Sequence, residues 1–422
     1  MKKMKNEAHD KKADVVPKLR FPEFRGSAGW EIKQLTQVAS RVTQRNSTSI
    51  EVRVLSNSAV DGVVDQRDFF DKDIANKDNL GNYFVVEKGD FVYNPRISNS
   101  APVGPISQNK IGRGVMSPLY TVFRFKHDTC GYYDQYFNTD RWYDYLKSVS
   151  NTGARHDRMA ISNDAFMGMP IPYPEPIEQQ RIADCLSSLD SLISAHTQKL
   201  DGLKVYKKGL MQQLFPAKGE TVPKLRFPEF RGKGEWEEVE IGRIGNVSMC
   251  KRILKEQTSI DGNIPFYKIG TFGKQADAYI NNETYEDYKT RFSYPQKGDI
   301  LISAAGTIGR LVVFDGTPSY FQDSNIVWIE NNEQIVSNQF LYHCYTMVVW
   351  STDTNTIPRL YNDNLRRMKI FSTSKSEQQR IAAFLSSIDN LITAQAQKIE
   401  SLKVHKKGLM QQLFPAMDEA NA

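Results

Sequence analysis

Residues 178–217 read EQQRIADCLSSLDSLISAHTQKLDGLKVYKKGLMQQLFPA, and residues 377–416 read EQQRIAAFLSSIDNLITAQAQKIESLKVHKKGLMQQLFPA. The two stretches are 199 residues apart and share 29 identities in 40 positions. The period is too long for a solenoid, whose units run to roughly 20–50 residues. The sequence therefore predicts a duplicated domain of about 200 residues, with this stretch at the end of each copy.

Apolar residues in both stretches recur with the alternating three- and four-residue spacing that is typical of a coiled coil. In the first copy the predicted seam contains Leu186, Leu189, Ile193, Leu200, Leu203, Leu210 and Leu214. In the second copy it contains Leu385, Ile388, Ile392, Ile399, Leu402, Leu409 and Leu413. Polar residues complete the seam at matching places, namely His196, Lys207, Gln395 and Lys406.

A seam this narrow needs a partner, and the other copy of the helix is the nearest one. Residues 182–214 would form about 50 Å of helix at 1.5 Å per residue. Pro174 and Pro176 precede the first helix, and Pro216 and Pro415 end the two helices. Antiparallel pairing would give the chain pseudo-two-fold symmetry, with the polar seam residues helping to fix the register.

A shorter repeat opens each copy. PKLRFPEFRG occurs at residues 17–26 and again at 223–232, and a Trp-Glu pair follows each one. Between the short and long motifs only scattered anchors are shared, such as Lys-Gly-Asp at 88–90 and 297–299. A common scaffold with different loops is what two readers of different ligands would show. Drift without function is the alternative.

The variable regions are rich in β-branched and aromatic residues, with frequent Gly, Pro and Asn. Short strands are predicted at 84–86, 121–125, 311–314 and 326–329, and helices at 132–149 and 337–350. The predicted fold class is α+β, with two globular α+β domains separated by a pair of long antiparallel coiled-coil helices.

The composition favours a polyanionic partner and an intracellular location. The 422 residues carry a net charge of +6, as many nucleic-acid-binding proteins do. No apolar run reaches the roughly 18 residues of a membrane-spanning helix. The charged start MKKMKNEAHDKK lacks the apolar stretch of a secretory signal. The four cysteines are scattered, which favours reduced thiols in the cytoplasm.

Several loops of the variable regions mix Arg with amide and hydroxyl side chains. Arg suits the guanine edge in the major groove, Asn and Gln suit adenine, and Arg and Lys neutralise phosphates. The candidate DNA contacts in the first copy are Asn94, Arg96, Ser98, Asn99, Arg155, His156 and Arg158. In the second copy they are Ser303, Thr307, Arg310, Arg359, Asn362 and Asn364. Exposure to water alone would also make loops polar.

No catalytic motif is visible in the sequence. Residues 94–97 (NPRI) lack the second proline and the aromatic residue of an amino-methyltransferase loop, and they are predicted to form a turn. Residues 306–309 (GTIG) are too short for a phosphate loop and are predicted to form a tight turn between strands. None of the six histidines is spaced as a metal-binding pair. The patterns favour a chain without catalytic or metal sites.

A variable domain followed by a helix that opens Glu-Gln-Gln-Arg-Ile-Ala, twice over, resembles the HsdS-like specificity (S) subunit of type I restriction–modification systems. The strings PKLRFPEF, GDILISAAGTIGR, EQQRIAAFLSSID and KKGLMQQLF carry this resemblance, which covers residues 17–416. The first copy departs from the pattern where YNPRISNSAPVGPI replaces the GTIG turn.

The resemblance implies a non-catalytic subunit that gives a DNA methyltransferase and endonuclease complex its sequence specificity. Each variable domain would be a target recognition domain that reads one half of an asymmetric, bipartite DNA target. The helices would fix the spacer between the halves. The predicted order is an N-terminal tail (1–16), target recognition domain 1 (17–177), spacer helix 1 (178–216), target recognition domain 2 (217–376), spacer helix 2 (377–416) and a C-terminal tail (417–422).

The resemblance also implies partners. These would be double-stranded DNA, two methyltransferase (M) subunits docked on the helices and flanks, and motor–nuclease (R) subunits. The M subunits would bind S-adenosylmethionine and flip out an adenine in each half-site. The R subunits would use ATP and magnesium. This chain itself is expected to hold no cofactor.

Two other interpretations stay open. An autonomous two-site DNA-binding regulator would bind DNA tightly without partner subunits. An enzyme with unrecognised motifs would methylate or cut DNA by itself. The lysine pairs of the repeated KKGLMQQLFPA are predicted to be solvated, with contact to a partner subunit or to the DNA spacer as the alternative.

Overall fold

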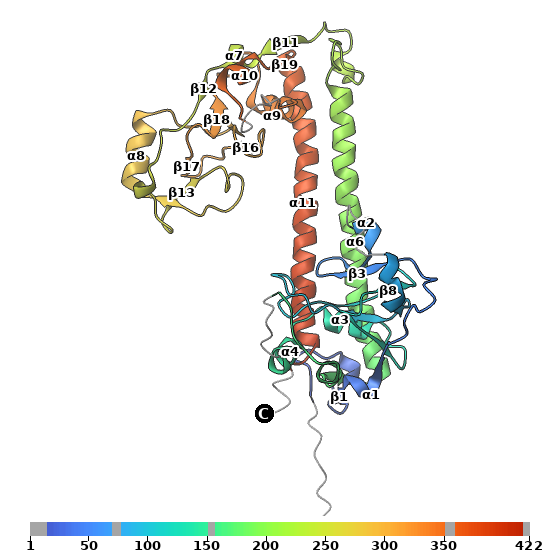
Figure 1. Ribbon diagram of the computed structural model, residues 1–422. Coiled ribbons are helices and arrows are strands. Elements are labelled where there is room, and N and C mark those ends of the chain that lie inside the picture. Colours follow the sequence, from blue (N-terminus) through green and yellow to red (C-terminus); the bar gives the residue numbers. More distant parts are fainter. Residues whose placement is uncertain (1–14, 70–76, 151–156, 351–358, 417–422) are drawn as a thin grey trace, which may run out of the picture. The chain divides into compact units, whose positions relative to one another are not determined.

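The computed structural model describes residues 15–69, 77–150, 157–350 and 359–416. The chain divides into two compact units, Met1–His196 with Lys398–Ala422 and Thr197–Gln397. Both divisions fall inside the two longest helices, α6 (Pro176–Leu214) and α11 (Lys375–Leu413), which have 39 residues each (Figure 1). Each unit, called unit 1 and unit 2 below, therefore combines one variable region with a segment of both helices. This division groups residues by their contacts in space and does not follow the domain limits along the sequence given above. Those limits therefore remain predictions.

The centre of unit 1 is a four-stranded antiparallel sheet with short strand pairs beside it. The sheet order is β2 (Ala39–Arg41), β9 (Thr121–Phe125), β6 (Phe91–Tyr93), β7 (Ile106–Gln108). The pairs are β3 (Leu55–Ser58) with β4 (Gly62–Asp65), and β5 (Phe84–Val86) with β8 (Gly114–Met116). The helices are η1 (Pro22–Phe24), α1 (Leu35–Val38), α2 (Gln66–Phe69), η2 (Lys77–Asn82), α3 (Tyr132–Phe137), α4 (Tyr143–Val149) and α5 (Asn163–Met167).

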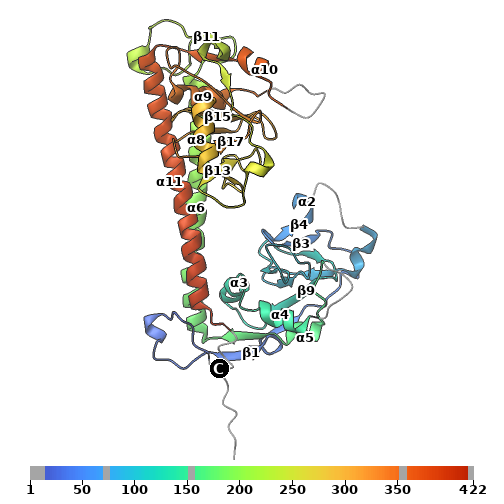
Figure 2. The same cartoon turned by 90° about the vertical axis from the view of Figure 1, so that its left-hand side faces the viewer.

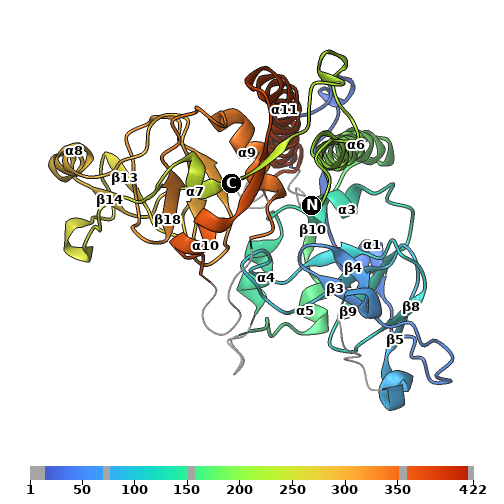
Figure 3. The ribbon, with the colours of Figure 1, turned by 90° about the horizontal axis from the view of Figure 1, so that it is seen from above.

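Unit 2 repeats the order of the four-stranded sheet. Its four-stranded sheet has the order β12 (Val247–Ser248), β18 (Ile326–Ile329), β15 (Ile300–Ser303), β16 (Leu311–Val313), and all pairs are antiparallel. A second sheet has the order β14 (Tyr279–Ile280), β13 (Ile264–Tyr267), β17 (Tyr320–Phe321). The helices are η3 (Pro228–Phe230), α7 (Ile241–Ile244), η4 (Lys255–Gln257), α8 (Asn282–Arg291), α9 (Asn338–Met347) and α10 (Asn362–Arg367). Figure 3 shows α8 beside β13 and β14, where Tyr285 is buried.

A short antiparallel ribbon closes each variable region. In unit 1 it pairs β1 (Glu31–Gln34) with β10 (Pro170–Tyr173), close to the start of α6 (Figure 2). In unit 2 it pairs β11 (Glu237–Glu240) with β19 (Lys369–Ser372). Because the first and last strands of the region lie side by side, the chain enters and leaves each variable region at one place.

The α+β class and the internal repeat are confirmed, and two local predictions are corrected. The helix predicted at 132–149 is interrupted between α3 and α4, where Thr139 Oγ1 donates to Tyr136 O at 2.7 Å. Such local side-chain bonds compete with the helix ladder. Residues 94–97 form no hydrogen-bonded backbone turn: Arg96 makes an isolated β-bridge with Arg158, and Asn94 Oδ1 accepts from Arg96 N at 3.0 Å, as in an Asx-turn. The tight turn at 306–309 is present, with positive φ at Gly306 and Gly309.

Candidate functional site

A buried ion pair joins the short and long repeated motifs of unit 1. Arg20 Nε and Nη2 donate to Oε1 and Oε2 of Glu178, both at 2.8 Å. Trp30 Nε1 donates to the same carboxylate at 2.9 Å. The charged side chains are only 7% and 2% exposed. A carboxylate tolerates burial when a guanidinium binds it in a bidentate way and other donors bind its remaining lone pairs. The short motif therefore fixes the start of α6.

Unit 2 builds the same contact with one different donor. Arg226 Nε and Nη2 donate to Glu377, both at 2.7 Å. Thr373 Oγ1 supplies the third hydrogen bond at 2.6 Å. Pro174 stands at the equivalent place in the first copy and has no hydroxyl. Trp236 Nε1 is correspondingly buried without a hydrogen-bond partner among the described residues.

The tail of α11 anchors in unit 1. Leu19 N, in the short motif, donates to Gln412 O at 3.0 Å. The ring of Phe414 lies 5.3 Å from that of Tyr132 and 5.7 Å from that of Tyr136. The FPA end of the repeated KKGLMQQLFPA thus places an aromatic side chain in the core of unit 1.

The tail of α6 anchors in unit 2 in the same way. Leu225 N donates to Gln213 O at 2.9 Å. Phe215 stacks on Phe340 with ring centroids 5.4 Å apart, and it meets Trp236 edge-on at 5.7 Å. Each short motif therefore binds the start of one long helix and the end of the other, which explains why both motifs repeat together.

Two matched ion pairs link the long helices. Lys207 Nζ lies 2.6 and 2.7 Å from the carboxylate oxygens of Asp389 in unit 2. Lys406 Nζ lies 2.6 and 2.7 Å from those of Asp190 in unit 1. Each lysine side chain is only 14% exposed. The prediction of solvated lysines is therefore wrong for Lys207 and Lys406, whereas the second lysine of each pair, Lys208 and Lys407, is exposed as predicted.

The predicted seam lies on the inward side of the helix segments. All of its apolar residues named above are buried or half-buried. Leu186 and Leu413 belong to the core of unit 1, and Leu214 and Leu385 belong to the core of unit 2. Within each unit the start of one helix therefore lies beside the end of the other, so the segments run antiparallel.

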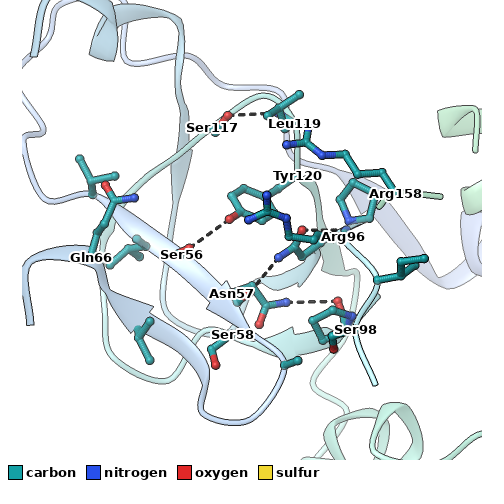
Figure 4. A pocket seen from close by; sticks show the side chains of 18 of the residues that line it. Ser56, Asn57, Ser58, Gln66, Arg96, Ser98, Ser117, Leu119, Tyr120 and Arg158 are labelled. Carbon is teal, nitrogen blue, oxygen red and sulfur yellow. Dashed lines mark hydrogen bonds between the residues drawn. The ribbon is translucent and has the colours of Figure 1, made fainter. Parts of the chain in front are cut away.

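The predicted contact loops of unit 1 come together around a cavity. The bridge between Arg96 and Arg158 brings residues 94–99 beside the segment that begins at 157. With strand β3 and residues 117–120 these segments line a cavity of about 410 Å³ (Figure 4). Arg155 and His156 lie outside the described residues.

The side chains of these loops differ in their exposure to solvent. Arg96 is 66% exposed, and its nearest carboxylate oxygen, on Asp157, is 3.7 Å away. Ser98 and Asn99 are exposed. Asn94 is half-buried, and its amide donates to Asn57 O at 2.9 Å and accepts from Arg96 N at 3.0 Å. Asn94 therefore supports the loop.

The sequence patterns missed several residues of this cavity, namely Ser56, Asn57, Gln66 and Tyr120. Asn57 is 2% exposed on β3. The position 209 residues later, the same offset that relates the two Lys-Gly-Asp anchors, holds Phe266. The sequence signal for Asn57 was an amide residue at a position where the second copy has an aromatic residue.

The predicted residues of unit 2 gather at the turn between β15 and β16. Ser303 is 1% exposed, and its hydroxyl donates to Thr307 O and accepts from Arg310 N at 2.8 Å. Its hydroxyl therefore stabilises the turn, and the DNA contact predicted for Ser303 stays a prediction. Arg310 Nη1 donates to Phe272 O at 2.8 Å. The side chain of Thr307 is exposed.

The second predicted segment of unit 2 lies against the first. Arg359 forms an isolated bridge with Ala305, and its Nη2 donates to Ser324 O at 3.2 Å. Asn362 is exposed and Asn364 is half-buried, both on α10. The bridge of Arg359 to Ala305 corresponds to that of Arg158 to Arg96, so both units bring their two predicted loops together.

Two buried titratable groups of unit 2, His343 and Asp299, have shifted pKa values. Burial lowers the pKa of His343 to about 4; nearby Lys207 also lowers it, and Asp389 raises it. Burial raises the pKa of Asp299, and hydrogen bonds from Gln296 N and Asn338 oppose that rise. In unit 1 the matching Asp90 is instead held by Arg124 through two hydrogen bonds, at 2.5 and 2.9 Å.

The described residues contain no group of three or more His, Cys, Asp or Glu side chains placed to hold a metal ion. In the same part of the chain, no helix combines the length and the apolar character needed to cross a membrane. The four cysteines are free thiols, and Cys250 and Cys344 are buried.

Comparison with known proteins agrees with this architecture. The family of type I restriction modification DNA specificity domains matches residues 233–404. A putative type I restriction enzyme specificity subunit of Haemophilus influenzae is 46% identical over 239 residues, which are 56% of this chain and 60% of that protein. The chain is therefore similar in sequence to type I specificity subunits over these lengths. The MjaVIII specificity subunit of Methanocaldococcus jannaschii is 28% identical over 364 residues, or 80% of this chain and 76% of that one.

Solved structures show the same fold for the specificity subunits. The S subunit of a type I restriction–modification system from M. genitalium aligns with a TM-score of 0.58 and 13% identity, over 96% of this chain and all of that one. A chain from a study of complex assembly and conformational transition of the type I R-M system gives 0.55 and 17% identity, over 92% and 97%. The match to the Haemophilus specificity subunit spans less than two thirds of that protein.

Proposed function

We propose that this chain is the non-catalytic DNA sequence-specificity subunit of a type I restriction–modification complex. Each variable domain reads one half of a bipartite DNA target. The observation that carries the proposal is that a common framework of helices and buried ion pairs holds two differently lined sets of loops. Because the loops of the two units differ, the target is asymmetric.

The exposed residues of the predicted loops contact the DNA directly. In unit 1 these are Arg96, Ser98 and Asn99. In unit 2 they are Thr307 and Asn362. Arg96 supports this role best, because a largely exposed guanidinium with only a distant carboxylate is available to a phosphate or a guanine.

The long helices offer docking sites for two copies of one partner. Unit 1 exposes Leu192 and Val404, and unit 2 exposes their repeats, Leu391 and Val205. The exposed fractions are 42%, 71%, 57% and 72% in that order. An exposed helix position has no packing reason to stay apolar, and exposed apolar patches mark interaction sites. Two identical patches suit two methyltransferase subunits.

The remaining parts of the proposal concern the assembled complex. The helices set the spacer, since 39 residues form about 58 Å of helix, against roughly 34–36 Å for one turn of DNA. The methyltransferase subunits supply S-adenosylmethionine chemistry, and motor–nuclease subunits use ATP and magnesium. The complex works in the cytoplasm.

A domain exchange tests the proposal. The closing ribbons define the junctions, so residues 35–169 can be replaced by the matching segment of another specificity subunit while β1 and β10 are kept. Methylome sequencing of cells that hold the complete complex should then show one half of the methylated motif changed and the other retained. The matched control exchanges residues 241–368 between β11 and β19, and it should change the other half.

A change in both halves, or in neither, would contradict modular reading. The alternative of an autonomous DNA-binding regulator has its own measurement, namely DNA affinity of the chain with and without methyltransferase subunits. Sequence-specific binding by the chain alone, unaltered by the subunits, would favour the regulator. Methyl transfer by the chain alone would show an enzyme.

A further inference from the structure

The cavity of unit 1 contains a buried hydrogen-bond acceptor without a partner. Asn57 Nδ2 donates to Val92 O at 2.7 Å and to Pro105 O at 3.2 Å. These two carbonyls fix the orientation of the amide, because the opposite orientation would set oxygen against oxygen. Asn57 Oδ1 is then left buried with no hydrogen-bond partner among the described residues. A buried acceptor in this state favours a ligand that carries an N–H group.

The same cavity also contains a buried hydrogen-bond donor that lacks an acceptor among the described residues. Arg158 Nε is buried without a hydrogen-bond partner in the described chain, and the nearest oxygen of Asp157 is 3.7 Å away. Arg96 lines the cavity as well and keeps most of its surface open. Two guanidinium groups at one cavity favour an anion, above all a phosphate.

An aromatic side chain and a further hydroxyl group also line the cavity. Tyr120 lines the cavity, and its hydroxyl lies 3.0 Å from Ser56 Oγ. Figure 4 shows Tyr120, Asn57, Arg96 and Arg158 gathered around the pocket. Its volume of about 410 Å³ falls in the range of small-molecule sites, roughly 300–1,000 Å³.

We propose that this cavity binds a single nucleotide. A base with an exocyclic amino group, adenine or cytosine, donates to Asn57 Oδ1, and the phosphate lies at Arg96 and Arg158. The nucleotide comes either from solution or from DNA, as a base turned out of the duplex. The DNA source rests on the proposed function, and the free source does not.

Titration calorimetry with the full-length chain tests the free source. We expect saturable binding of AMP or CMP, and about tenfold weaker binding of IMP or UMP, in which a carbonyl replaces the amino group and leaves Asn57 Oδ1 unpaired. Arg96→Gln and Arg158→Gln should each weaken binding about tenfold. The matched control is Arg291→Gln, an arginine 64% exposed with one aspartate partner in unit 2, and it should change nothing.

Fluorescence of 2-aminopurine tests the DNA source. The probe is placed in turn at each position of the half-site read by unit 1, apart from the methylated adenine, and the complete complex is added. A rise at one position that Arg96→Gln abolishes and Arg96→Lys partly restores shows a nucleotide turned into the cavity. Absence of both nucleotide binding and such a rise overturns the proposal. If no methylated motif depends on this chain, the proposed function fails and the calorimetry alone decides.

Discussion

Lys207 of α6 forms an ion pair with Asp389 of α11, with Nζ 2.6 Å from Oδ1. The same relationship recurs between Lys406 and Asp190, each 199 residues away from its counterpart. A lysine that is 14% exposed has lost most of its hydration, so its aspartate must compensate. The polar positions of an apolar seam thus act as register marks.

We expect Lys207→Met to destabilise unit 2 by about 1–2 kcal/mol, between the values for exposed and buried pairs, because Asp389 is left without its cation in a half-buried place. Urea denaturation of the full-length chain measures the change. Lys208→Met, one residue further on an exposed face, is the control and should stay within about 0.5 kcal/mol. Equal effects of the two substitutions would contradict a register role for Lys207.

Removing the charge of Glu178 should have a larger effect. In Glu178→Gln the buried Arg20 loses its counter-charge, and we expect a loss of about 3–5 kcal/mol. The control is Glu23→Gln, which breaks the exposed ion pair of Glu23 with Arg181. That pair joins the same two motifs, yet exposed pairs contribute only about 0–1 kcal/mol. Comparable losses in both variants would show that burial does not set the strength of the contact.

The stability of unit 2 should fall in mild acid because of His343. The pKa of His343 is about 4 in the folded state and near 6.5 in the unfolded state. Its contribution to the stability of unit 2 is therefore fully present above pH 6.5 and is lost as the pH falls toward 4. The groups that face it are Lys207, Asp389 and Ser386, whose Oγ lies 3.4 Å from Nε2. We expect a loss of about 2–3 kcal/mol between pH 7 and pH 4.

Substituting the histidine tests this prediction. The urea midpoint of His343→Gln should fall less between pH 7 and pH 4 than that of the unsubstituted chain. His405→Gln, on an exposed position of α11, is the control and should retain the full dependence. An identical pH dependence in all three proteins would rule out His343 as its source.

Lengthening the helices should lengthen the DNA spacer. One heptad inserted into both α6 and α11 adds about 10 Å at 1.5 Å per residue, or about three base pairs at 3.4 Å each. Methylome sequencing should show a longer spacer between unchanged half-sites, or no methylation. A heptad in α6 alone moves one helix relative to the other and should abolish methylation. An unchanged spacer after the double insertion would disprove the ruler.

The repeated apolar patch should be required for assembly. Leu192→Gln with Leu391→Gln should weaken binding of the methyltransferase subunit at least about tenfold, because each removes apolar area from a docking surface. Analytical ultracentrifugation of the mixed subunits measures it, and the stability of the free chain should hardly change. Ile260→Gln, 91% exposed in unit 2 and outside the repeat, is the control. Normal assembly by the double variant would refute the docking site.

The succession of repeated domains and long helices along this chain could be predicted from local sequence patterns. A heptad seam such as Leu186 to Leu214 needs only helical periodicity to be recognised, and the exact repeat supplies its partner. The roles of single loop residues depend more on the tertiary structure. Ser303 carries the expected hydroxyl, but tertiary packing turns it into the β15–β16 turn. Whether a polar side chain faces solvent or backbone depends on the loop path, which local propensity does not set.

By itself the sequence determined the duplication, the two long helices, the α+β class and the resemblance to specificity subunits, because repetition and periodicity are properties of the letters alone. Only the tertiary structure decided that Arg20 meets Glu178, 158 residues away, and that Phe414 enters the core of unit 1. It also decided that Asn57 and Arg158 share one cavity. The physical reason is that burial and pairing depend on contacts between distant segments, whose geometry is absent from any window of sequence.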